Sequence, residues 1–170
     1  MKFNRLIGLG LVAFMLGACG GSDQEDVADD ASAPAADEIS VSDAELAGNP
    51  FMEEWDTPYG VPPFSDIENA HYMPAIKKGI LDLRAEIDAI VTNPEAPTFE
   101  NTIVALELAG ELLGDVASTF GNITGTDTDD ELRALESEIY PMLTREFDAI
   151  TLNPDLWARV KAVYEQRDSL

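Results

Sequence analysis

The side chains that could carry out chemistry in this sequence are one histidine, one cysteine and 33 acidic residues. His71 is the sole histidine, so the chain can build neither an HExxH motif nor another zinc site with two histidines. A Ser-His-Asp triad would have to use His71 itself. Because His71 stands beside Tyr72 at the entrance of a predicted helix, we expect a capping or surface imidazole. We assign no catalytic residue to this chain.

Carboxylates are densest in residues 126–131, with the sequence TDTDDE, which could point to a hard cation. The spacing does not match a calcium-binding loop, and the central glycine of such a loop is missing. Thr128 and Glu131 have the spacing of a capping box, and the aspartates suit the positive end of a helix dipole. We therefore expect a helix start here, and no metal ligand in this chain.

The charge balance is strongly negative, with 33 acidic against 10 basic residues and a net charge of −23. Nucleic-acid binding needs patches of Lys and Arg that neutralise phosphates, and the basic residues here are scattered. No Gly-rich phosphate loop and no dinucleotide fingerprint occurs. We therefore expect no nucleic-acid partner.

The first 18 residues have the pattern of an export signal, with Lys2 and Arg5 before an apolar run that is short for a membrane span. The segment LGAC that ends at Cys19 resembles the bacterial lipobox, so we expect lipidation of Cys19 and a membrane anchor. Residues 19–48 are rich in Asp, Glu, Ala and Ser and are interpreted as an acidic, disordered tether. The predicted location is the periplasmic face of a bacterial envelope.

Residues 49–69 are rich in proline and aromatic residues, which predicts an extended arm. Its aromatic side chains are expected to dock on a helical body, and a peptide-binding platform is the alternative. They are Phe51, Trp55, Tyr59 and Phe64.

The remaining residues, 70–170, carry apolar side chains at helical spacing and no alternating run of strand length. The predicted fold is all-α. Its four helices span residues 70–92, 98–123, 128–151 and 154–168. Pro74 fits a first turn, Pro141 predicts a kink near Ser137, and Asn153 with Pro154 fits a helix start.

The helix over residues 98–123 has the longest apolar pattern, so we expect it to be the most buried one. Thr98 is its expected cap, with Phe99 and Ile103 facing inward and Glu100 facing outward. Glycine inside a helix costs roughly 1 kcal/mol relative to alanine. We therefore expect that close packing requires Gly110 and Gly114.

The segment PTFENT at residues 97–102, followed by IVALE, resembles the amino-terminal region of bacterial dipeptidyl carboxypeptidases in the thimet oligopeptidase family of zinc metallopeptidases. Further segments resemble the family in the same order. They are NPF at 49–51, PPF at 62–64, HYMPA at 71–75, NIT at 122–124, DEL at 130–132, and LNP at 152–154 through Arg159, Val160 and Lys161. The resemblance covers essentially residue 49 to the C-terminus.

The resemblance implies an almost wholly helical peptidase whose two halves flank a deep channel for short peptides. It also implies a zinc ion, held by an HExxH helix and a downstream glutamate of the carboxy-terminal half. None of these ligands occurs in this sequence. The chain is therefore expected to be inactive alone, with the catalytic half as its missing partner, oligopeptides as substrates of the complete enzyme and zinc as that enzyme's cofactor.

Whether the chain acts as an enzyme is left open by the sequence. Our hypothesis is a truncated family member, the non-catalytic N-terminal region of an exported peptidase that releases C-terminal dipeptides. The alternative is a non-enzymatic helical lipoprotein that binds peptides or acts in the envelope. If the fragment stands alone, we expect apolar surface to be left open.

Overall fold

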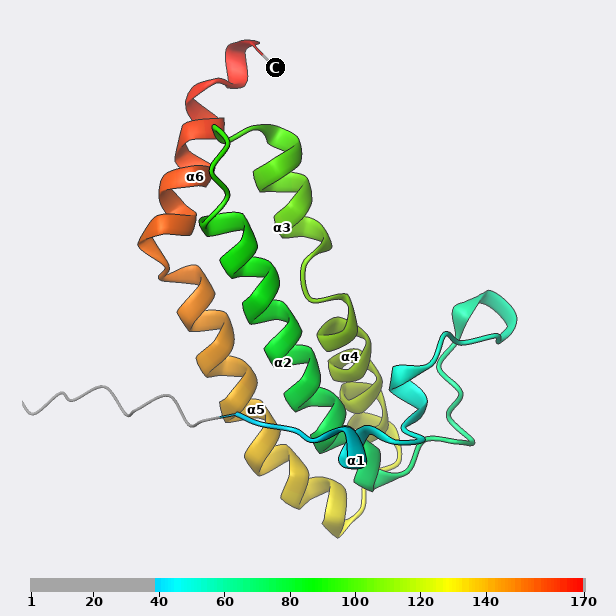
Figure 1. Cartoon of the computed structure of the whole chain (residues 1–170). Helices are drawn as coiled ribbons and strands as arrows, with labels where there is room; N and C mark the ends of the chain where they lie inside the picture. Colours follow the sequence, from blue (N-terminus) through cyan, green and yellow to red (C-terminus); the bar gives the residue numbers. More distant parts are fainter. Residues whose placement is uncertain (1–38, 170) are drawn as a thin grey trace, which may run out of the picture. The chain divides into compact units, whose positions relative to one another are not determined.

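The computed structural model describes residues 39–169, and within this range it is helical and contains no strand (Figure 1). The predicted export signal, Cys19 and most of the predicted tether lie outside the described residues. The prediction of an all-α fold is confirmed. The α-helices are α1 (Asp43–Leu46), α2 (Asn69–Val91), α3 (Ala105–Leu108), α4 (Glu111–Thr126), α5 (Asp130–Thr151) and α6 (Pro154–Glu165). Shorter turns are η1 (Pro50–Met52), η2 (Pro58–Gly60), the π-helical η3 (Phe99–Val104) and η4 (Arg167–Ser169).

Helix α2 is the centre of this unit, because α4 packs on one of its sides and α5 and α6 on another (Figure 1). Its buried side chains follow the apolar stripe of the sequence: Tyr72, Ala75, Ile76, Ile80, Leu83, Ile87 and Ile90. Gly79 lets α4 approach closely, since a Cβ atom there would lie 2.9 Å from Leu113 Cα. The expectation that residues 98–123 form the most buried helix is therefore wrong, and α2 has that place.

The chain does not form one helix over residues 98–123, as the apolar pattern predicts. The helix breaks at Ala109, which is extended, and at Gly110, whose φ of +79° is left-handed. Only glycine adopts such a φ without steric cost, so the helix break requires Gly110. A Cβ at Gly110 would also lie 3.1 Å from Leu83 Cδ1, so the packing there is close, as expected. Gly114 has open space around its missing Cβ, so the packing expectation is wrong at Gly114.

The faces of the segment after Thr98 also differ from the prediction. Thr98 caps the segment as expected, because its Oγ1 accepts a hydrogen bond from the Asn101 N–H at 3.1 Å. Phe99, however, is 44% exposed, and Thr102 is the fully buried side chain of η3. The wider turn of a π-helix rotates successive side chains away from the 3.6-residue period, which puts Phe99 outside. Glu100 is exposed, as predicted.

Helix starts follow capping chemistry, with two shifts from the sequence prediction. Asp129, and not Thr128, caps α5, because its Oδ1 accepts from the Leu132 N–H at 2.7 Å. Helix α2 begins at Asn69, so Pro74 lies in its second turn. Asn153 caps α6 and Pro154 occupies its first position, as predicted. Helix α5 runs through Pro141 as one element, and the kink near Ser137 stays a prediction.

The arm over residues 49–69 is largely irregular. Its first part docks on the core, and Ile67 near its end packs there too. Phe51 is buried, with its ring centroid 5.7 Å from that of Tyr72 and 6.0 Å from that of Trp55. Tyr59 is fully exposed at a left-handed φ of +65°, and Phe64 is 42% exposed, so docking of all four aromatics is wrong. Tyr59 and Phe64 belong to a part of the arm that the core does not cover.

The ordered chain begins before residue 49, so the predicted extent of the tether is too long. Ile39 packs against the core, and α1 is closed by a capping box in which Glu45 accepts from the Ser42 N–H at 2.8 Å. An apolar side chain and a capped turn give this acidic segment enough contacts to be ordered. None of the described helices is both long and apolar enough to cross a membrane.

Candidate functional site

His71, the one imidazole of the chain, acts as a cap. Its Nδ1 accepts a hydrogen bond from the Glu68 N–H at 2.9 Å, at the start of α2, and its backbone carbonyl accepts from the Asn49 side chain at 2.8 Å. Within residues 39–169, no group of three His, Cys, Asp or Glu side chains could hold a metal ion. A zinc site of the HExxH type does not fit the residues that are present.

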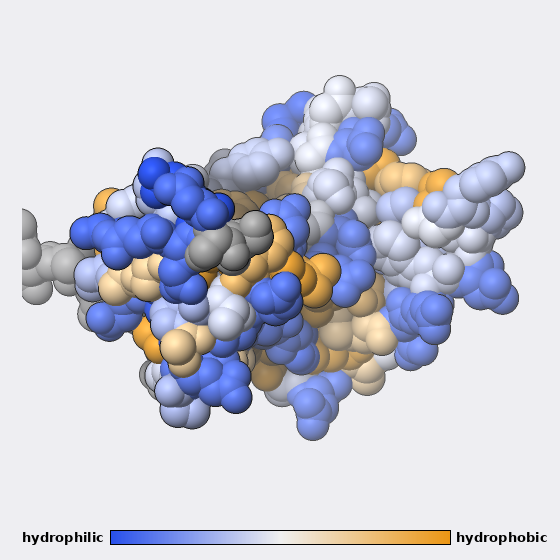
Figure 2. All heavy atoms as spheres, turned by 90° about the horizontal axis from the view of Figure 1, so that it is seen from above, coloured by the Kyte–Doolittle hydropathy of each residue, from blue (hydrophilic) through white to orange (hydrophobic). Residues whose placement is uncertain are grey.

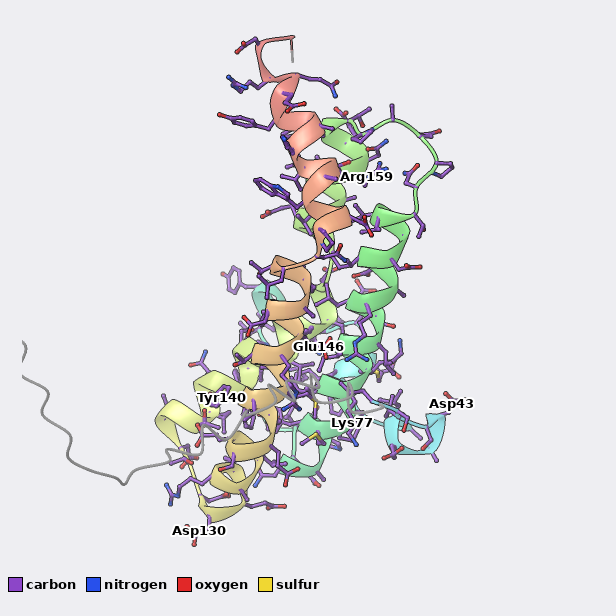
Figure 3. All side chains as sticks on the ribbon, turned by 90° about the vertical axis from the view of Figure 1, so that its left-hand side faces the viewer. Asp43, Lys77, Asp130, Tyr140, Glu146 and Arg159 are labelled. Atoms are coloured by element: carbon purple, nitrogen blue, oxygen red, sulfur yellow. The ribbon has the colours of Figure 1, made fainter. Side chains whose placement is uncertain are left out.

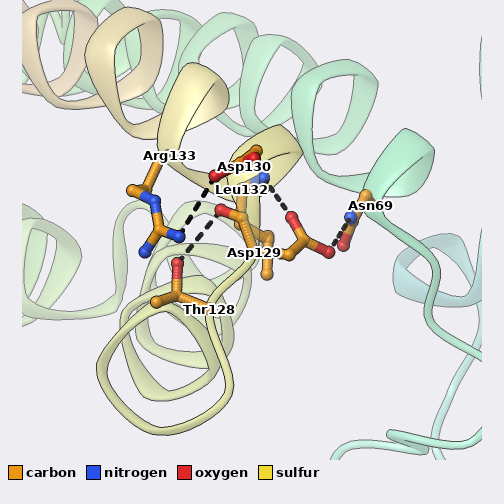
Figure 4. A network of polar contacts seen from close by, with 6 residues as sticks. All are labelled: Asn69, Thr128, Asp129, Asp130, Leu132 and Arg133. Carbon is orange, nitrogen blue, oxygen red and sulfur yellow. Dashed lines mark hydrogen bonds and ion pairs between the residues drawn. The ribbon is translucent and has the colours of Figure 1, made fainter.

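The acidic cluster at the start of α5 links two helix ends (Figure 4). Asp129 and Glu131 both accept from the Asn69 side-chain amide, at 3.2 and 3.0 Å, and Asp130 pairs with Arg133 at 3.2 Å. The hydrogen bond from the Leu132 N–H is the main cause that lowers the pKa of Asp129. This cluster therefore fixes the start of α5 against the start of α2.

A partly buried ion pair holds α5 against α2. Arg84 Nε donates to Glu146 Oε2 at 2.8 Å, and Arg84 Nη2 donates to Glu146 Oε1, which makes a two-bond fork. Figure 3 labels Glu146 on α5, next to α2. The Glu146 side chain is only 10% exposed. Hydrogen bonding to Glu146 raises the pKa of Arg84. The fork specifies one register of the two helices.

Arg159 of α6 is the most unusual charged residue of the described chain, because it is 9% exposed and donates its hydrogen bonds to neutral oxygens. Its Nη1 donates to the carbonyls of Asn93 at 2.9 Å and Glu95 at 3.4 Å, and its Nη2 donates to Asn101 Oδ1 at 3.3 Å. Its Nε is buried without a partner. The guanidinium thus fastens α6 to the connection between α2 and η3 (Figure 3).

Asn101 is the second half of this junction. Its Oδ1 accepts from the Thr98 N–H at 2.8 Å and from the Thr102 hydroxyl at 2.9 Å, in addition to Arg159. Its Nδ2 donates to the Ala96 carbonyl at 3.0 Å. The most distinctive motif of the sequence is therefore a folding junction, and Arg159 is the partner that sequence reasoning did not assign to it. Both residues stand within the segments that resemble the thimet oligopeptidase family.

A groove of about 350 Å³ lies beside the junction, between the end of α2 and the η3–α3 segment. Its lining is Glu86, Ala89, Ile90, Asn93, Asn101, Ala105, Leu108 and Ala109. Glu86, the one acid in this lining, accepts a hydrogen bond from the Gly110 N–H at 2.7 Å. The groove thus offers apolar contact and amide groups, which can hold a chain segment, and it presents no nucleophile next to a base.

Two curated relatives resemble most of this chain. The dipeptidyl carboxypeptidase of Escherichia coli K12 is 46% identical over 122 residues, and that of Salmonella typhimurium is 42% identical over 125 residues. These matches cover 72% and 74% of this chain. This chain is a homologue of the dipeptidyl carboxypeptidases. The resemblance to the thimet oligopeptidase family is thereby confirmed.

The relationship extends at lower identity to oligopeptidase A. The Salmonella typhimurium oligopeptidase A is 30% identical over 96 residues, which are 56% of this chain and 14% of that relative. No family model matches the sequence. The chain spans only about 18% of the length of the two dipeptidyl carboxypeptidases. The matched region is thus a small part of much longer relatives.

Proposed function

We propose that this chain is the N-terminal, non-catalytic helical region of an exported zinc metallopeptidase that releases C-terminal dipeptides from oligopeptides. The observation that carries the proposal is 46% identity over 122 residues to a dipeptidyl carboxypeptidase, of which those residues are 18%. In this account the catalytic chemistry belongs to the larger remainder of the enzyme, and the chain alone releases no dipeptide.

The role of this region is to build one rigid wall of the enzyme. Two pairs of side chains that are far apart in the sequence hold the helices together. Arg84 with Glu146 joins α2 to α5, and Arg159 with Asn101 joins α6 to η3. The groove between α2 and α3 faces outward from this frame and is the part of the wall that could contact an extended peptide. No catalytic residue is assigned to this chain.

Zinc, the proposed cofactor of the complete enzyme, would be held elsewhere in the polypeptide. The sequence has one histidine, and one nitrogen of that His71 ring is occupied in capping α2. In this proposal, no residue of this chain takes part in the zinc chemistry.

The proposed location is the periplasmic face of a bacterial envelope, through a lipid on Cys19. The support is the LGAC segment that ends at Cys19 after an apolar run with a basic start. Expression in a bacterium with a radiolabelled fatty acid tests this proposal. The chain is expected to carry the label in the membrane fraction, and Cys19→Ser is expected to lose it. Equal labelling of both forms contradicts the anchor.

A hybrid enzyme tests the proposed function. In it, this full chain replaces the matched segment of the Escherichia coli dipeptidyl carboxypeptidase. The hybrid is expected to release a C-terminal dipeptide from a blocked tripeptide when loaded with zinc, whereas the chain alone is not. A hybrid without activity contradicts the proposal. Tight binding of oligopeptides by the chain alone would then favour the alternative, a peptide-binding lipoprotein.

A further inference from the structure

Large apolar side chains are exposed along α5, α6 and the turn between them. Phe147 is 53% exposed, Leu152 78%, Trp157 63% and Tyr164 63%. We call these four residues the α5–α6 aromatic surface. Helices α2 and α4 have no exposed large apolar side chain in the described part of the chain. Other large apolar side chains of the described chain are exposed on the arm, on the η3–α3 segment and on α5, so this surface is one of several such regions: Tyr59, Val61, Phe64, Phe99, Val104, Leu108 and Tyr140.

Trp157 and Tyr164 form the part of this surface on α6, whereas Phe147 borders a groove that α5 shares with α2, α3 and α4. Trp157 and Tyr164 are seven residues apart, which is two helical turns, so they lie on one face of α6. The side chains of α6 that face the core are others: Leu156, Arg159 and Val163. Helix α6 continues beyond α5 along the same side of α2 (Figure 1). The three aromatic rings leave roughly 350 Å² of mostly apolar area open, at about 150–250 Å² for each ring when fully covered.

Basic side chains border this surface although the chain as a whole is acidic. Arg167 stacks on the Tyr164 ring, with its Cζ 4.3 Å from the ring centroid. Lys161 stands one turn after Trp157, is more than half exposed and lies 3.8 Å from Glu165. Arg167 also lies 4.0 Å from Asp168. Figure 2, which views the molecule from the end of α6 and α3, shows hydrophobic side chains between hydrophilic ones. Tryptophan, tyrosine and arginine are the residues most enriched at the energetic centres of protein interfaces.

The chemistry of the surface favours one kind of occupant. A net charge of −23 opposes both a second copy of this chain and an anionic lipid surface. A polypeptide with apolar side chains would cover the rings, and acidic side chains on it would compete with Glu165 and Asp168 for Lys161 and Arg167. The homologous enzymes contain such a partner in principle, because 82% of the length of the Escherichia coli relative lies outside the matched segment.

We propose that the α5–α6 aromatic surface is the docking surface for the remaining polypeptide of a dipeptidyl carboxypeptidase, with Trp157 and Tyr164 at its centre. This inference rests on the proposed function and adds the place where the two parts of the enzyme meet. According to this inference, the rings that are exposed in this chain are buried in the complete enzyme.

The test uses the hybrid enzyme described above, with Trp157→Ser and Tyr164→Ser introduced together. We expect the unfolding temperature of the hybrid to fall by about 4 °C or more, as for the loss of interface centres. Tyr59→Ser, which removes a fully exposed ring on the arm, is the matched control and is expected to change nothing. In the chain alone, the double substitution should shift urea unfolding only slightly, because both rings are 63% exposed there.

The outcomes separate this inference from the proposed function. An active hybrid whose unfolding temperature does not respond to the double substitution overturns the docking surface and leaves the proposed function standing. An insoluble or inactive hybrid overturns both. Binding of the chain to phosphatidylcholine vesicles, or formation of a dimer, that the double substitution abolishes would also overturn the inference, because the surface would then have another occupant.

Discussion

Arg159 allows the sharpest test of how this fold is held together. Replacement of Arg159 by methionine keeps much of the side-chain volume and removes every hydrogen bond that the guanidinium donates. Three oxygens then lose a donor: the carbonyls of Asn93 and Glu95 and the Oδ1 of Asn101. The α2–η3 connection loses these links to α6 and keeps the 3.4 Å hydrogen bond from Gln166 Nε2 to the Pro97 carbonyl.

Two opposing effects set the size of the change. A good hydrogen bond from a charged donor stabilises by about 1.5–3 kcal/mol, and only the 2.9 Å bond to Asn93 has good length. The two bonds of 3.3 and 3.4 Å contribute less. Against this, methionine removes the cost of burying a cation whose Nε has no partner. We expect a net loss of about 2 kcal/mol in the free energy of unfolding.

Urea unfolding of the full chain, followed by helical circular dichroism, measures this loss. The control is Arg133→Met, because Arg133 is 56% exposed and pairs with an exposed aspartate, so its replacement should change stability by no more than about 0.5 kcal/mol. If Arg159→Met is as stable as the control, Arg159 does not hold α6 to the α2–η3 connection, and the reasoning is refuted.

Four further substitutions test other parts of the fold, each by urea unfolding. Gly110→Ala should destabilise by about 1–2 kcal/mol because its φ is +79°, whereas Gly114→Ala should stabilise by up to about 1 kcal/mol; equal effects would contradict the helix break. Phe120→Ala should cost about 3–5 kcal/mol, because this ring is fully buried between Tyr72 and Tyr140; a loss below about 1 kcal/mol would be inconsistent with the core. The lowered pKa of Asp129 adds stability that is complete above the unfolded pKa of about 4 and is lost as pH falls through the folded pKa. Asp129→Asn keeps the capping oxygen without the charge, so its stability relative to the wild type should improve on acidification; no such trend would refute the cap.

The sequence predicts those features of the fold that depend on local chemistry. The apolar stripe of α2 is readable because Ile76, Ile80, Leu83, Ile87 and Ile90 recur at helical spacing, and all five are buried. The caps at Thr98 and Asn153 follow from side chains that accept bonds from the next turn of backbone. Such interactions join residues that are two or three positions apart.

The helix break at Gly110 and the exposure of Phe99 could not be predicted in this way. An apolar run continues across Gly110, and the sequence does not reveal that its backbone is left-handed. Phe99 keeps the spacing of a buried residue, and the π-helical turn moves it outside. In both cases the backbone geometry gives a different result from the one that the spacing of apolar residues predicts.

The junction of Asn101 with Arg159 is also invisible to local reasoning, because the two residues are 58 positions apart. The motif that contains Asn101 is distinctive in the sequence, but its meaning depends on α6 returning to the end of α2. The burial of Arg159 in α6, among core positions that are otherwise apolar, would have indicated this contact. The sequence shows the arginine but does not show that it is buried.

The DNA downstream of codon 170 tests the central claim most directly. If this chain is the N-terminal region of a peptidase of this kind, sequencing of the native gene should find coding for an HExxH motif within the next several hundred codons, in one of the reading frames. Absence of that motif from every frame over that distance would contradict the account and leave a helical lipoprotein without a catalytic half.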